Sequence, residues 1–316
     1  MPNLEISEEV LNDENLIGIF SKYSKKFKPV KVIDFPRRSY PHGLALIENN
    51  TKLVATDLYK FVLVLFDIEG NYLKSFNPHN LLDLPIGVCV LSKDLDEDSD
   101  SDEESNEEKI FVGDGANHKV FVFDLNFNLK YQFGDENMKV PYYMKIDNAY
   151  DKSRLYASDY ENHEITVWNA KTGKFIDKTF IRAPMQICLT EDCLYVSNYL
   201  YQFEQYDNGV VKFNEAGNCI TELNKETLGV LRRITGDWFA PNLLSVESNG
   251  NINIAACAFD NVSPSQMLSF FTIDPNGKVL KEVEMEMHRD EKEDIILVDN
   301  RIYGSIGRAF KMYEFE

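Results

Sequence analysis

Residues 119–134, KVFVFDLNFNLKYQFG, hold the phrase that decides the fold: an apolar strand ending in Asp124, a tight turn, and a second strand ending in Phe133. The same phrase recurs in the chain of 316 residues as VLVLFDIEGN at 62–71, ITVWNAKTG at 165–173, VVKFNEAG at 210–217 and SFFTIDPNG at 269–277. A repeat of this length that is made of short strands is typical of a radial or stacked all-β array.

Each copy of the phrase belongs to a longer unit of four short strands. A proline begins an apolar strand, a polar turn follows, and a second strand ends in Ala-Thr-Asp or a variant of it. These prolines are Pro41, Pro85, Pro141, Pro184 and Pro241. Four antiparallel strands that are apolar on both faces need a neighbour on each face, and the blades of a β-propeller provide this arrangement.

The sixth unit is incomplete, because residues 294–298, 301–305 and 309–315 supply only three strands before the chain ends. One orphan strand, residues 30–35, precedes the first unit. We expect it to be the outermost strand of the last blade, where it pairs the two ends of the chain and covers both sheet edges. The sequence therefore predicts an all-β, six-bladed β-propeller over residues 29–316, closed by an N-terminal strand in the last blade.

Residues 1–28 lie outside the predicted ring. Ser7 precedes Glu8 and Glu9, as in a helix N-cap with an acidic first turn, and apolar residues recur at roughly helical spacing up to Phe27. We expect a short N-terminal helical extension, either packed on the propeller or free to bind a partner.

The formal net charge of −19 disfavours nucleic acids and anionic membranes as partners, because Lys and Arg supply most of the affinity for both. The first residues have neither a basic stretch nor an apolar one, and no apolar run is long enough to cross a membrane. The five cysteines are scattered, which is typical of reduced thiols. Together these features predict a cytoplasmic protein, with a nuclear location as the alternative, that is not secreted.

The segment 94–108 carries ten acidic side chains and no basic one, so we expect a disordered acidic loop inserted in blade two. Ser99, Ser101 and Ser105 each have an acidic residue three positions on, the pattern of sites for acidophilic kinases. These serines are therefore candidate phosphorylation sites, and the alternative is an unmodified, solubilising loop.

The pattern of proline, apolar strand, strand ending in Asp, Gly turn and terminal Phe-Gly resembles NHL repeats over roughly residues 30–316, with residues 119–134 as the nearest copy. The resemblance implies a propeller that binds protein or RNA or, less often, acts as an enzyme. The RING, B-box and coiled-coil segments that accompany many NHL propellers have no counterpart in this sequence. Residues 167–174 also resemble a WD40 strand, so WD40 repeats stay as a minor alternative.

Enzymes among the six-bladed propellers allow two specific tests. A zinc site of the amidating-lyase type needs several His side chains in the central channel. The channel-facing position after each first proline holds His42, Ile86, Tyr142, Met185 and Asn242, of which only one is a histidine. A zinc site is therefore disfavoured.

A calcium site of the lactonase type needs a ring of Glu, Asn and Asp in the channel. One such residue ends the second strand of successive units: Asp57, Asp114, Asp159 and Asn198. We expect these side chains to cap the following turns instead. No catalytic motif is present, so the sequence predicts no cofactor and no catalytic residue.

The sequence predicts a non-catalytic protein-interaction scaffold that acts as a monomer and displays its loops and channel mouth to a protein partner. The candidate partner-binding residues are His42, Tyr142, Met185, Tyr199, Tyr201, Phe203, Tyr206, Arg232, Arg233 and Trp238. One alternative is a metal-dependent propeller enzyme. The other is an RNA-binding propeller that uses a local basic patch of Lys22, Lys25, Lys26, Lys28, Arg37, Arg38 and Lys60.

Overall fold

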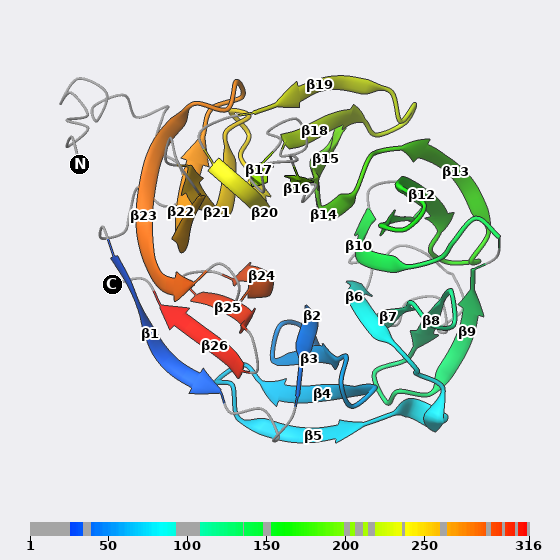
Figure 1. Cartoon of the computed structure of the whole chain (residues 1–316). Coiled ribbons are helices and arrows are strands. Elements are labelled where there is room, and N and C mark those ends of the chain that lie inside the picture. The colour runs from blue at the N-terminus through cyan, green and yellow to red at the C-terminus, as the bar shows by residue number, and fades with distance from the viewer. Residues whose placement is uncertain are drawn as a thin grey trace.

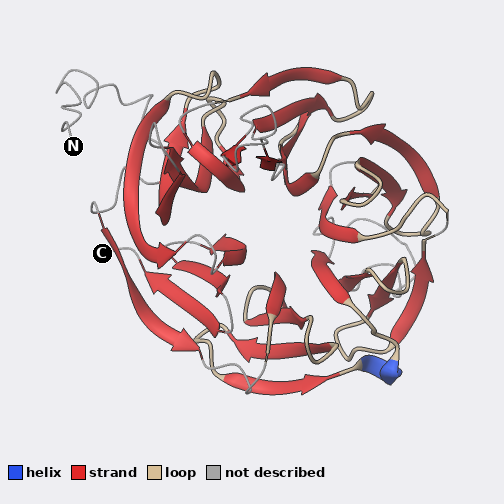
Figure 2. Cartoon of the chain, in the orientation of Figure 1, coloured by secondary structure: helices blue, strands red, loops and turns tan. Residues whose placement is uncertain are grey.

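The computed structural model describes residues 26–33, 39–92, 108–134, 136–147, 153–198, 203–205, 211–213, 219–235, 238–259, 264–288, 292–298, 301–306 and 309–314. Nearly all of these residues lie in β-strands or in the turns that join them (Figure 2). The 3-10 turn Pro78–Asn80 is the one helical element in the described part of the chain.

Four sheets have four antiparallel strands each. The first holds β2 (Pro41–Ile47), β3 (Lys52–Asp57), β4 (Val62–Asp67) and β5 (Tyr72–Phe76). The second holds β6 (Pro85–Leu91), β7 (Lys109–Asp114), β8 (Lys119–Phe123) and β9 (Leu129–Phe133). The third holds β10 (Pro141–Asp147), β11 (Arg154–Asp159), β12 (Glu164–Asn169) and β13 (Phe175–Phe180). The fourth holds β14 (Pro184–Leu189), β15 (Cys193–Asn198), β18 (Cys219–Asn224) and β19 (Val230–Ile234).

A fifth sheet has eight strands in the order β20-β21-β22-β23-β1-β26-β25-β24. The bounds are β20 (Trp238–Val246), β21 (Ile252–Phe259), β22 (Pro264–Ile273), β23 (Val279–His288), β1 (Lys26–Ile33), β26 (Ala309–Glu314), β25 (Arg301–Ile306) and β24 (Lys292–Val298). A separate two-stranded sheet holds β16 (Phe203–Gln205) and β17 (Val211–Phe213).

The sheets stand around a common axis, and the first strand of each unit lines the centre (Figure 1). These inner strands contact one another in the order β2, β6, β10, β14, β20, β24, and β24 contacts β2 again. The molecule is therefore a closed all-β propeller.

The expected six separate blades with an N-terminal helix are wrong. Counted by separate sheets, the ring has five blades, of which one is eight strands wide. The physical reason is that both edges of β1 are used. β1 pairs antiparallel with β26, which joins the two ends of the chain, and also pairs in parallel with β23 through Lys26 and Phe27. No sheet boundary remains there, and β1 is not an outermost strand. Residues 26–28 lie in this strand, and the rest of the predicted helix lies outside the described residues.

The repeat copy at 210–217 does not supply the third strand of the fourth sheet, which corrects its assignment from sequence. Residues 211–213 form the small hairpin with β16, and β18 pairs with β15 instead. The turn after β18 shows why. Asn224 Oδ1 accepts bonds from the N–H groups of Glu226 and Thr227, just as Asn169 Oδ1 does from Lys171 and Thr172. Cys219–Asn224 therefore ends in the turn chemistry of the repeat.

The core lies between neighbouring sheets rather than inside each one. The middle strands are buried on both faces, as the pattern iBBBBB of β3, β7 and β11 shows. Ile47 and Val54 of the first sheet pack with Ile110 and Phe123 of the second. A sheet that exposes two apolar faces is stable only between neighbours, so closure of the ring completes the core.

The acidic segment lies outside the described residues except for its last one, Glu108. A Glu108 carboxylate oxygen accepts the backbone N–H of Glu48 at 2.9 Å, across the first and second sheets. This end of the segment is therefore anchored to the β2–β3 turn. In the described part of the chain, no helix is both long and apolar enough to cross a membrane.

Candidate functional site

The inner strands begin on one face of the ring, which we call the proline face. Pro41 pairs with Asp57, Pro85 with Asp114, Pro141 with Asp159, and Pro184 with Asn198. The turns that follow those Asp and Asn residues therefore lie on the same face as the prolines. This face presents the β3–β4, β7–β8 and β11–β12 turns around the channel mouth.

A hydroxyl from the neighbouring strand stabilises the start of three inner strands, where the pairing register shifts. Thr56 Oγ1 accepts the N–H of Gly43 at 2.8 Å and donates to the carbonyl of Ile86 in the next sheet at 2.7 Å. Ser158 and Ser197 accept the equivalent N–H groups of Tyr143 and Gln186. The recurring Ala-Thr-Asp motif thus holds the channel wall in shape.

The Asp residues of the same motif cap turns. Asp114 accepts four backbone N–H bonds, from Asp83 and Leu84 through Oδ2 and from Ala116 and Asn117 through Oδ1. Asp57 and Asp159 likewise accept N–H groups from the residues just before the inner strand and from the turn that follows each Asp. Asn198 differs, because its Oδ1 accepts the hydroxyl of Thr221 and the thiol of Cys219. The carboxylates are therefore directed at backbone amides, as their capping role requires.

The described residues contain no group of three or more His, Cys, Asp or Glu side chains that could hold a metal ion. His118 and His163 occupy the same position in two turns and bond to the backbone there. His118 Nδ1 bonds to the carbonyl of Lys139 at 2.7 Å, and His163 Nδ1 accepts the N–H of Ala183 at 3.2 Å.

His42 and Tyr142 meet at the channel mouth although their strands are not neighbours. Their rings lie 4.7 Å apart and perpendicular, and His42 also lies 5.5 Å from the ring of Tyr143. The His42 side chain is fully buried. Burial lowers the pKa of His42 to about 4, so the imidazole stays neutral at pH 7.

An aromatic row runs outward from this point across the proline face of the third sheet. Tyr142 lies 5.9 Å from Tyr160, Tyr160 lies 6.4 Å from His163, and His163 lies 6.4 Å from Phe180. Tyr160 is 36 % exposed and Phe180 is 66 % exposed. We call Tyr142, Tyr160, His163 and Phe180 the aromatic row. Large exposed aromatic side chains of the first sheet belong to the same face: Tyr40, Tyr59 and Phe61.

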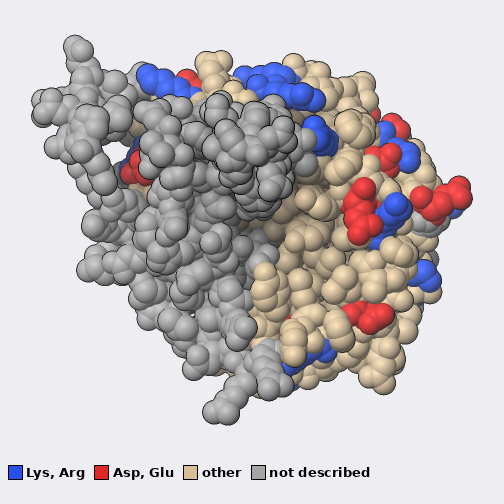
Figure 3. All heavy atoms as spheres, in the orientation of Figure 1, with Lys and Arg blue, Asp and Glu red and all other residues tan. Residues whose placement is uncertain are grey.

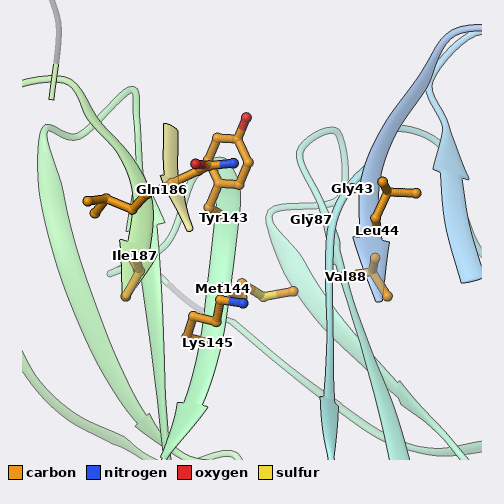
Figure 4. A pocket seen from close by; sticks show the side chains of 10 residues that line it. Gly43, Leu44, Gly87, Val88, Tyr143, Met144, Lys145, Gln186 and Ile187 are labelled. Atoms are coloured by element: carbon orange, nitrogen blue, oxygen red, sulfur yellow. The ribbon is translucent and has the colours of Figure 1, made fainter. Parts of the chain in front are cut away.

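A small cavity of ≈ 30 Å³ lies inside the ring, below the channel mouth. Tyr143, Lys145 and Gln186 line it from β10 and β14, and Gly43 and Gly87 line it from β2 and β6 (Figure 4). A Cβ atom on Gly43 would lie 2.5 Å from the carbonyl oxygen of Ile86, and one on Gly87 would lie 2.7 Å from that of Tyr142. Only glycine lets the inner strands approach this closely.

The predicted partner-binding residues differ in burial and do not form one surface among the described residues. His42 and Met185 are buried, and Tyr142 is half-buried in the aromatic row. Arg232 forms an ion pair with the largely buried Glu222, and Arg233 is exposed on β19. Phe203 lies in β16, and Trp238 begins β20. The other candidates lie outside the described residues: Tyr199, Tyr201, Tyr206 and the candidate phosphorylation sites Ser99, Ser101 and Ser105.

Sequence reasoning named Tyr142 of the aromatic row as a binding residue but missed Tyr160, His163, Phe180 and Lys145. Tyr160 and His163 belong to a turn of the repeat, and Phe180 ends an outer strand, so no local spacing marks them as a set. The aligned units do carry one signal, because Tyr160 follows the capping Asp159 where Gly115 follows Asp114. A large aromatic residue in a turn that accepts glycine indicates a role beyond the turn.

No protein-family model matches the sequence, and no curated protein matches it. Solved structures do match its fold. The WD40 repeats of RRP9 superpose with a TM-score of 0.58 at 8 % identity, covering 92 % of this chain and 100 % of that one. A gluconolactonase from Xanthomonas campestris has a TM-score of 0.58 at 12 % identity, covering 88 % and 86 %. The hydrazine synthase of Kuenenia stuttgartiensis also superposes with a TM-score of 0.58, at 9 % identity, covering 84 % of this chain and 74 % of that one. These similarities show a β-propeller fold and nothing finer.

Proposed function

We propose that this propeller is a non-catalytic protein-interaction scaffold that binds its partner on the proline face. The observation that carries the proposal is the aromatic row, in which four rings in sequential contact extend from the channel mouth to the rim. Tyr and Trp side chains are enriched at the energetic centres of interfaces because they bury large areas with little loss of rotamer entropy.

The exposure of the row supports a docking role over a packing role. Phe180 keeps 66 % of its surface exposed at the end of β13, and Tyr160 keeps 36 %. Both belong to a closed ring whose inner strands are tightly joined, so binding costs little conformational entropy. The assignment of the repeats to the NHL family, a cytoplasmic location and a monomeric state are part of this proposal.

The experiment places a photo-crosslinking amino acid at Phe180 in cells and identifies the proteins attached to it. A matched control places it at Ile176, which is 43 % exposed on the same strand but outside the row. We expect an adduct at Phe180 that is absent at Ile176 and is lost when Tyr160→Ala is added. Identical adducts at both positions, or adducts insensitive to Tyr160→Ala, would reject the docking face.

The two alternatives have direct tests. Among the described residues in the view of Figure 3, Lys and Arg lie on the rim next to Asp and Glu rather than in one basic surface. Retention of single-stranded RNA at moderate salt would favour RNA binding over the scaffold. Stoichiometric zinc or calcium in the purified protein would favour a metal-dependent enzyme.

A further inference from the structure

One inner-strand position differs from its equivalents in the other units. Four residues after each unit's first proline the chain has Ala45, Cys89, Cys188 and Ser245, all small, but Lys145 in the third unit. Lys145 lies on β10, is exposed, and lines the cavity inside the ring. The channel therefore contains a cation at a position that is otherwise small and uncharged.

This lysine has no ion-pair partner among the described residues. Asp147 lies two residues further along β10, but its carboxylate binds Lys225 at 2.8 Å. The other side chains around the cavity are apolar or neutral, including Leu44, Val88 and Ile187. Lys145 is exposed, so the effective dielectric constant around it is that of a protein surface, about 20, at which a cation still attracts an anion more strongly than in bulk water.

The two cysteines close to Lys145 do not supply the missing negative charge. Cys89 and Cys188 both interact electrostatically with Lys145 from the flanking inner strands. Burial raises the pKa of Cys89 to about 12 and also raises that of Cys188. Both thiols are therefore neutral at pH 7.

We propose that Lys145 binds a carboxylate group that enters the central channel from the face opposite the proline face. His42 and Tyr142 meet at the proline end of their strands, whereas Lys145 lies three residues further along β10. The cavity of ≈ 30 Å³ holds about two water molecules, which the two oxygens of a carboxylate can replace. The rest of the ligand then lies along the channel.

This site is independent of the proposed function, because the aromatic row lies at the other end of the channel. A protein could bind the row without using Lys145, and a ligand could bind Lys145 without any partner on the row. The Phe180 crosslinking test and the test below can therefore succeed or fail separately.

The test follows the lysine side chains by NMR after reductive ¹³C-methylation, which keeps the positive charge. Lys145→Arg identifies the Lys145 signal, and Lys74, exposed on β5, is the reference. Sodium acetate is titrated against sodium chloride at constant ionic strength. We expect a saturable shift of the Lys145 signal with acetate, no comparable shift with chloride, and no saturable shift at Lys74.

A second arm separates a free small carboxylate from a peptide side chain. N-acetyl-aspartyl-glycinamide replaces acetate, and tighter binding than acetate identifies a peptide as the preferred source, whereas weaker binding identifies a small molecule. Thermal melting provides an independent measurement. Acetate should raise the Tm of the parent protein and of Lys74→Met but not that of Lys145→Met.

Two results would overturn the proposal. In the first, the Lys145 signal drifts linearly, as the Lys74 signal does, which would mean an unspecific ionic effect. In the second, the Lys145 signal moves without added acetate when the ten acidic residues of 94–108 are replaced by amides. The chain's own carboxylates would then fill the site.

Discussion

Lys225 and Asp147 form a buried ion pair that joins the third and fourth sheets. Lys225 Nζ lies 2.8 Å from Asp147 Oδ2, and the two side chains are 8 % and 12 % exposed. Lys225 Nζ also donates to the carbonyl of Thr190 at 3.0 Å. The pair therefore links the end of β10 to two turns of the next sheet.

Breaking this pair should destabilise the propeller strongly. Lys225→Met leaves the buried Asp147 carboxylate without the Lys225 cation. Asp147→Asn leaves the buried Lys225 ammonium without the Asp147 carboxylate. Each should cost about 3 kcal/mol of the free energy of unfolding, measured by urea denaturation. The double variant should cost less than the sum of the two, because no unpaired charge remains.

Lys52 and Glu48 provide a surface control for this ion pair, with side chains 33 % and 32 % exposed. Lys52→Met should change the free energy of unfolding by less than about 1 kcal/mol. Equal losses in Lys52→Met and Lys225→Met would show that burial of the Lys225 pair has no energetic consequence.

His42 should make stability depend on pH. Its pKa falls from 6.5 to about 4 on folding, so the unfolded chain binds a proton in this range that the folded chain does not. The contribution of neutral His42 to the free energy of unfolding is therefore fully present above pH 6.5, and it is lost as the pH falls from 6.5 towards 4. The loss approaches about 1.4 kcal/mol per pH unit within that window.

His42→Gln tests this dependence, because glutamine does not titrate. Urea denaturation of both proteins at pH 7 and pH 4.5 should show a smaller loss of stability on acidification in the variant. Carboxylates titrate in both proteins and cancel in the comparison. An equal loss in the two proteins would mean that His42 is accessible to protons in the folded state.

Gly43 should not tolerate even alanine. A Cβ atom there would lie 2.5 Å from the backbone oxygen of Ile86, which cannot move without displacing the second sheet. We expect Gly43→Ala to lower the free energy of unfolding by about 2 kcal/mol or more. Gly229→Ala is the control, since its Cβ would meet only the Thr227 hydroxyl at 3.3 Å. It should be close to neutral in the same urea titration.

Asp114 should matter to stability and not to metal content. Asp114→Ala removes the acceptor of four backbone N–H groups and should cost about 2–4 kcal/mol in the free energy of unfolding. Asp124→Ala, in an exposed turn with Asn128, should cost less. A drop in Tm on adding EDTA to the parent protein, absent in Asp114→Ala, would instead show that the Asp residues hold a metal.

The strands and turns were predictable because their causes are local. Alternating apolar residues between Asp and Gly turns indicate short paired strands, and the tight turn predicted after Asp67 is present, with Asp67 accepting hydrogen bonds from Asn71. The capping role of Asp57, Asp114 and Asp159 also followed from the motif itself. The error at 210–217 came from the same local reasoning. Two segments had strand chemistry, and only pairing with β15 distinguishes them.

The sequence by itself determined an all-β repeat propeller with capped turns, and it located the prolines at which four of the inner strands begin. The fifth predicted start was wrong, because β20 begins at Trp238 and Pro241 lies inside it. Only the tertiary structure decided that β1 uses both its edges, which merges two sets of strands into one sheet. It also decided which side chains meet: the aromatic row combines residues of β10, the β11–β12 turn and the end of β13. Lys145 lines the cavity without an ion-pair partner among the described residues. The reason is physical, since strand and turn formation depends on neighbours in sequence. Which strands pair with both edges of β1, and which side chains line the channel, depends on how the whole ring closes.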